Sequence, residues 1–161
     1  MDWIFGGFLA ASILHMVEEY FYPGGFMDVM KGFNPKFAPF VTPRMAVIIN
    51  GLQLLLCVLA MIVGRNLPIF SMSIAGLLFI NALMHIGACV RIKGYSPGVV
   101  TGALLYLPLS IYAYALFLGS SQLTWDGILI TGLIGLLYQA IPIGYFLSAA
   151  EYYRHKSPRI S

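Results

Sequence analysis

The sequence contains very few charged residues. Only 9% of its 161 residues are Asp, Glu, Lys or Arg, whereas 60% are hydrophobic, and the mean hydropathy is +0.86. A soluble helical domain of this size needs a charged face on each helix, and none of the long segments here has one. The scarcity of charge therefore excludes a soluble bundle and predicts an all-α, polytopic membrane protein.

Basic residues and cysteines are also scarce. The net charge is +3, and the nine Lys and Arg residues are scattered among separate loops, so they form no basic stripe for nucleic acid. Cys57 and Cys89 both lie within apolar stretches, which favours buried free thiols over a disulfide. We therefore expect no nucleic-acid partner, and we expect the lipid bilayer as the main surroundings of the chain.

Five apolar stretches are long enough to cross about 30 Å of hydrocarbon, which takes roughly 20 helical residues. They lie at about 3–20, 45–63, 68–90, 98–118 and 126–150 and form one expected domain, 1–150, followed by a short basic cytoplasmic tail, 151–161. The one long connection, 21–44, is rich in Gly, Pro and aromatic residues. It is either a lid over a site or a connector anchored at the lipid headgroups.

The distribution of positive charge predicts the orientation. With five spans, every Lys and Arg residue except Arg65 falls on one side of the membrane. By the positive-inside rule that side is cytoplasmic, so the N-terminus is outside and the C-terminus is inside. We expect a multi-pass protein of a bacterial or archaeal cell membrane.

Ionisable side chains inside the predicted spans are costly and are therefore candidates for function. His15, Glu18 and Glu19 lie within about one turn, near the cytoplasmic end of the first span, and both carboxylates flank the imidazole. In the third span, Asn81 and His85 are one turn apart and reach the same depth. Groups that are far apart in the sequence thus meet near one membrane face.

Two imidazoles and a carboxylate are the ligand set of a known class of catalytic metal site. We expect His15, His85 and Glu19 to bind one divalent ion, zinc or iron, with Glu18 as a general base or a further ligand. All four are candidate catalytic residues. A di-iron site is disfavoured because it needs four carboxylates, and the spans offer only Glu18, Glu19 and, at the far end of the last one, Glu151.

A structural interpretation of the same residues stays open. His15, Glu18 and Glu19 could form only a neutralising cluster near the interface, paired with headgroups and loop lysines. Asn81 and His85 could be interhelical hydrogen-bonding contacts. The common depth of both histidines and both glutamates favours the site.

Further polar groups near the same face are candidates for substrate binding. Pro97 and Gly98 allow a tight entry into the fourth span, where backbone N–H groups could hold an anion. A plain helix start is the alternative for this segment. The candidate substrate-binding residues are Asn50, Gln53, Asn81, Tyr95, Pro97, Gly98 and Thr101.

Three short motifs resemble those of the membrane protein family named for its HXXEE motif. Residues 15–19 match HXXEE, residues 81–85 match NXXXH and residues 95–101 match YXPGXXT, in the family's order. The resemblance implies an integral membrane protein with enzyme activity, and it supports the same site residues. It names no substrate.

A site at headgroup depth favours an enzyme that hydrolyses a lipid or another amphipathic molecule. Two alternatives stay open. One is a metal-free isomerase in which Glu18 and Glu19 shuttle protons, and the other is a proton-linked carrier of small molecules or lipids. A carrier of this size would need to act as a homodimer, since the chain has no inverted repeat.

Overall fold

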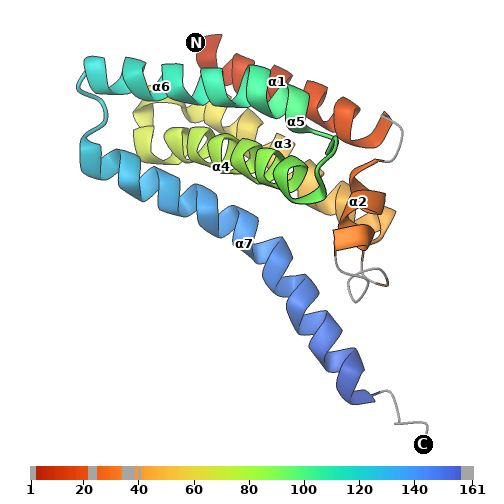
Figure 1. The fold of residues 1–161 in the computed structure, drawn as a ribbon. Coiled ribbons are helices and arrows are strands. Elements are labelled where there is room, and N and C mark those ends of the chain that lie inside the picture. Colours follow the sequence, from red (N-terminus) through yellow and green to blue (C-terminus); the bar gives the residue numbers. More distant parts are fainter. Residues whose placement is uncertain (1–2, 22–24, 34–38, 40, 157–161) are drawn as a thin grey trace, which may run out of the picture.

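The computed structural model describes residues 3–21, 25–33, 39 and 41–156, which contain helices and no strand. Five of these helices are long and apolar enough to cross a membrane. They are α1 (Trp3–Phe21), α3 (Pro43–Val63), α4 (Pro68–Ile92), the continuous run Val99–Gly119, and α7 (Trp125–Lys156). Figure 1 shows them in order along the chain. The expected all-α architecture with five apolar helices is confirmed.

Shorter elements complete the fold. They are α2 (Phe26–Phe33), the 3-10 turn η2 (Gly64–Asn66), α5 (Val99–Thr101), the π-helical turn η3 (Gly102–Tyr106) and α6 (Leu107–Gly119). The expected connection 21–44 therefore contains a short helix, although residues 22–24, 34–38 and 40 lie outside the described part of the chain. The last helix runs on to Lys156 and so includes the beginning of the expected tail.

Local sequence explains where the long helices begin and end. The side chain of Thr42 caps α3 by accepting a hydrogen bond from the backbone N–H of Met45, 3.3 Å away. Pro43 and Pro68 open α3 and α4, where a missing N–H costs nothing. Helix α4 ends at Ile92, and the left-handed backbone of its C-cap residue Lys93 (φ 51°) turns the chain.

Helix α4 lies at the centre of the bundle and contacts α1, α3, α6 and α7. Its contact with α7 is a backbone contact, because a Cβ added at Gly76 would strike the carbonyl oxygen of Thr131, and one at Gly135 would strike the backbone of Gly76. Small residues that allow backbones this close are typical of helix pairs in membranes. Beyond this contact α7 leaves the bundle towards the C-terminus (Figure 1).

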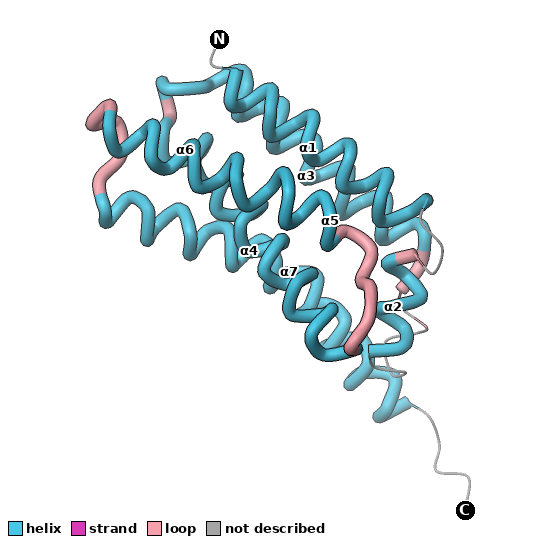
Figure 2. The backbone as a smooth tube through the Cα atoms, turned by 45° about the horizontal axis from the view of Figure 1, so that its top comes forward, coloured by secondary structure: helices cyan, strands magenta, loops and turns pink. Residues whose placement is uncertain are grey.

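Aromatic residues fill the bundle at the end where α1 begins. Phe5, Phe8 and Phe117 are fully buried, and the ring of Phe5 meets the other two nearly edge-on, with centroids 6.0 and 5.9 Å apart. The polar residues of α1 lie about 15 Å further along the same helix, at 1.5 Å per residue. Figure 2 shows the loop between α4 and α5 at that end, next to α2. The fold thus separates an apolar core from a polar end.

Candidate metal centre

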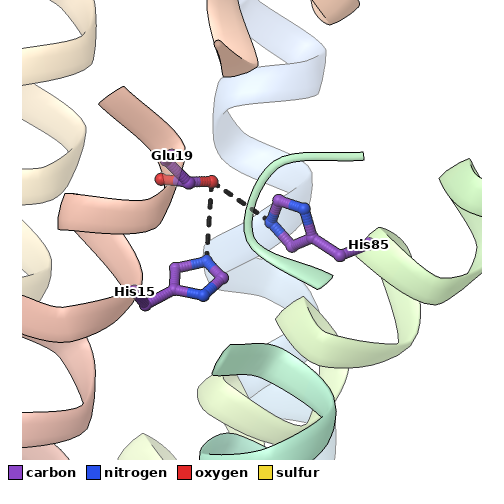
Figure 3. Close-up of side chains that lie close together, drawn as sticks. All are labelled: His15, Glu19 and His85. Carbon is purple, nitrogen blue, oxygen red and sulfur yellow. Dashed lines mark ion pairs between the residues drawn. The ribbon is translucent and has the colours of Figure 1, made fainter. Parts of the chain in front are cut away.

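Three side chains converge between α1 and α4 (Figure 3). Oε1 of Glu19 lies 3.1 Å from Nε2 of His85 and 3.5 Å from Nε2 of His15. The two imidazole rings meet edge to face, with centroids 4.9 Å apart. All three residues are buried, with exposed fractions of 2% for His15 and 5% for Glu19 and His85. The convergence expected from the two motifs is present.

The donor set of this cluster suits a metal ion. One ligand atom from each of His15, Glu19 and His85 lies within 4.8 Å of the others. Nε2 of His15 is buried, yet it has no hydrogen-bond partner among the residues that the structure describes. Two imidazoles and one carboxylate are a ligand set of catalytic zinc, which leaves a fourth position open. The three side chains therefore fit a single divalent ion.

Glu18 lies outside this cluster and faces the beginning of α5. Its Oε1 accepts hydrogen bonds from the Tyr95 hydroxyl (2.6 Å) and the Val100 N–H (3.0 Å). Its Oε2 accepts from the N–H (2.7 Å) and the hydroxyl (2.5 Å) of Thr101. These backbone donors are the ones that an N-cap side chain usually satisfies. Glu18 therefore caps a helix that follows it by about eighty residues in the chain.

This arrangement changes the role expected of Glu18. Its carboxylate has four donors around it, and it does not belong to the group of side chains able to share an ion. The geometry therefore supports neither a ligand role nor a free general base at Glu18. The backbone N–H groups that could have held an anion at the entrance of the fourth span donate to Glu18 itself.

Gly98 lies directly against both imidazoles. A Cβ at this position would approach to 2.6 Å from Cε1 of His85 and 2.8 Å from Cε1 of His15, and the backbone has a φ of +93°. Both conditions favour glycine. Gly98 is also the N-cap residue of α5 and has no side chain to cap it. The carboxylate of Glu18 therefore accepts the hydrogen bonds of the helix N-terminus that the side chain of an N-cap residue would usually accept.

The other members of the YXPGXXT motif support the same contact. Pro97 is fully buried beside Gly98, and Tyr95 is 37% exposed while it holds Glu18. The hydroxyl of Thr101 also lies 2.8 Å from Nδ1 of His15. The segment therefore packs on the cluster of His15, Glu19 and His85, and its polar groups are engaged within the protein. Substrate binding by these residues stays a prediction.

Tyr106 lies behind His15 and was not among the candidates. Its ring is fully buried and stacks on the imidazole, with centroids 4.4 Å apart and planes 30° apart. The side-chain amide of Gln53 donates to the hydroxyl of Tyr106 (2.9 Å) and to that of Ser12 (3.2 Å). Gln53, which we expected to bind substrate, therefore holds Tyr106 in place against His15. Tyr106 ends the π-helical turn η3, and no motif in the sequence indicates such a turn.

The two asparagines differ in their surroundings. The side chain of Asn50 donates an exposed hydrogen bond to the hydroxyl of Tyr20. Asn81 lies one turn before His85, and its buried Oδ1 has no hydrogen-bond partner within the described ranges. Asn81 thus keeps an acceptor available for a ligand, whereas Asn50 has a structural contact.

Comparison with known proteins yields one family. The model of the family described as "Protein of unknown function with HXXEE motif" matches residues 6–113, a range that includes all three motifs. No curated protein and no solved structure matches the chain. The resemblance seen in the motifs is confirmed, and the chain belongs to the HXXEE family of proteins of unknown function.

Proposed function

We propose that this chain is an integral membrane enzyme that binds one divalent metal ion through His15, Glu19 and His85. One observation carries the proposal: two imidazoles and a carboxylate, all buried, place their ligand atoms within 4.8 Å of one another. Burying three polar side chains among apolar helices is costly unless they share a partner. A metal ion would be such a partner.

The number of ligands favours catalysis over a structural role. Structural zinc sites use four protein ligands, whereas catalytic sites use three and keep a position for water or substrate. No fourth His, Cys, Asp or Glu side chain of the described residues joins this group. Imidazole nitrogen also favours zinc or iron over magnesium or calcium. A bound ion of this kind would supply a Lewis acid for hydrolysis.

The position of the cluster suggests the substrate class. Glu19 lies in the last turn of α1, which ends at Phe21, so the site is close to one end of an apolar helix. A lipid or another amphipathic molecule reaches that depth from within the membrane, with its polar group at the level of the site. We therefore propose hydrolysis of such a substrate, on the cytoplasmic side given the expected orientation.

Metal analysis of purified protein tests the proposal. We expect about one zinc or iron per chain in the wild type and a large loss in His85→Ala, because the second imidazole is removed. Hydrolysis of a panel of lipid esters should then stop after chelation and return when zinc is added. A folded wild type that contains no metal, or an unchanged metal content in His85→Ala, would rule the proposal out.

A metal-free isomerase is the second candidate, and one observation favours it. Oε1 of Glu19 lies within ion-pair distance of Nε2 of both histidines, so a proton could pass among the three side chains without an ion. Such a group could move a proton between two carbons of a lipid-like skeleton. Activity that survives exhaustive chelation and is lost in Glu19→Gln would select this candidate over the metalloenzyme.

A further inference from the structure

The hydroxyl of Thr101 lies between the carboxylate of Glu18 and the imidazole of His15. Its Oγ1 lies 2.5 Å from Oε2 of Glu18 and 2.8 Å from Nδ1 of His15. The carbonyl oxygen of Gly98 is a further, more distant neighbour at 3.4 Å. The hydroxyl is thus shared between a carboxylate and an imidazole nitrogen.

A hydroxyl has a single hydrogen, and this hydrogen goes to Glu18. An ionised carboxylate only accepts hydrogen bonds, and the oxygens of Glu18 already face the N–H groups of Val100 and Thr101 and the hydroxyl of Tyr95. Donation from Thr101 to His15 would leave two bare oxygens facing each other at 2.5 Å. Thr101 therefore accepts from His15, and the proton of the imidazole is on Nδ1.

We infer that Glu18 and Thr101 set the tautomer of His15 and thereby prepare its Nε2 as a metal ligand. With the proton on Nδ1, Nε2 of the neutral ring carries a lone pair. Nε2 is the atom that faces Glu19 and that lacks a hydrogen-bond partner among the described residues. Metal-binding histidines usually donate their other ring N–H to an oxygen, which fixes the ring and raises its basicity.

Glu18 and Thr101 are thus positioning residues, and they connect the HXXEE and YXPGXXT segments of this chain. The first glutamate of HXXEE holds the threonine of YXPGXXT, and the threonine holds the histidine of HXXEE. The statement about metal affinity rests on the proposed function, whereas the statement about the tautomer does not.

Nitrogen NMR of protein labelled with ¹⁵N-histidine in lipid nanodiscs tests the tautomer without any substitution, since protonated and bare ring nitrogens have distinct shifts. The signals of His15 are identified by their absence in His15→Gln. We expect a protonated Nδ1 and a bare Nε2 in the metal-free wild type. A proton on Nε2, alone or together with one on Nδ1, would overturn the inference.

Three variants then test the relay, by which we mean the hydrogen bonds that run from Glu18 through Thr101 to His15. Zinc is the probe. Thr101→Val removes the hydroxyl, so the proton of His15 should move to Nε2 and the affinity for zinc should fall about 10- to 100-fold, as for other outer-shell changes. Thr101→Ser restores the hydroxyl and should restore both readouts. Thr131→Val is the matched control, because Thr131 is buried on α7 and bonds to Tyr114 instead of the cluster.

The outcomes separate this inference from the proposed function. A wild type with the expected tautomer that binds no zinc would remove the metalloenzyme and leave the relay in place. If the wild type binds zinc and Thr101→Val has the same tautomer and the same zinc affinity, the relay is ruled out and the metal site stands.

Discussion

At the scale of single residues, position 98 imposes two requirements that only glycine meets. Its backbone has a positive φ, and its missing side chain leaves room for both imidazoles. A sequence motif reports that glycine is present, but the reason lies in α1 and α4, which are distant in the chain. The close approach of three segments at this glycine is therefore visible only in the structure.

Gly98→Ala should destabilise the protein by about 1–3 kcal/mol, because the new Cβ would collide with His15 and His85 and the backbone would be strained. Thermal unfolding in detergent measures this effect, and zinc affinity should fall with it. Gly87→Ala is the control. Gly87 lies on the same helix as His85, and a Cβ added there meets nothing within 4 Å. Equal stability of the two variants would contradict the close contact at Gly98.

The sequence predicted which side chains lie close together better than it predicted what each of them contacts. His15, Glu19 and His85 meet as expected, because helical spacing and depth are properties of local sequence. The two glutamates are adjacent, yet one faces His85 and the other caps α5. This division depends on where α5 begins relative to α1, and no local pattern encodes that placement.

At the scale of helices, the contact between α4 and α7 holds the last span to the bundle. The backbones meet at Gly76, Thr131 and Gly135, where there is no space for a larger side chain. Hydropathy predicted both helices, with bounds that agree within a few residues at their N-termini. It could not predict which faces meet, because lipid-facing and buried positions are equally apolar here.

Gly135→Ala should weaken this helix pair by about 1–3 kcal/mol, because its Cβ would strike the backbone of α4. Gly132→Ala, on the same helix, is the matched control, since nothing lies within 4 Å of its added Cβ. Unfolding in detergent, followed by helical circular dichroism, compares the two. A loss of stability in Gly132→Ala as large as in Gly135→Ala would contradict the assigned packing.

The π-helical turn is the feature of this scale that sequence patterns missed. Gly102–Tyr106 departs from the α-helical ladder and brings the ring of Tyr106 under His15. Such turns are frequent at functional sites, but they have no reliable sequence signal. Spacing along an ideal α-helix therefore could not assign Tyr106 to the site.

At the scale of the whole molecule, charge predicts the side of the membrane on which the site lies. Because every Lys and Arg except Arg65 falls on one side of five spans, we expect the C-terminus and the His/Glu cluster near the cytoplasm. A fluorescent protein fused after Ser161 should fold and emit in bacterial cells, whereas alkaline phosphatase at the same point should be inactive. The reverse pattern would place the site at the opposite face.

Metal binding by the cluster depends on the ligand residues, on the packing of α1 against α4 and on the fold of the whole bundle. Competitive titration of zinc into purified protein in nanodiscs should show one site in the wild type, and Glu19→Gln should lose more affinity than the roughly 10- to 100-fold typical of an outer-shell change. Asp126→Asn, in the exposed first turn of α7, should bind zinc like the wild type. A folded wild type that binds no zinc, or a Glu19→Gln variant that binds it equally well, would contradict a metal centre at His15, Glu19 and His85.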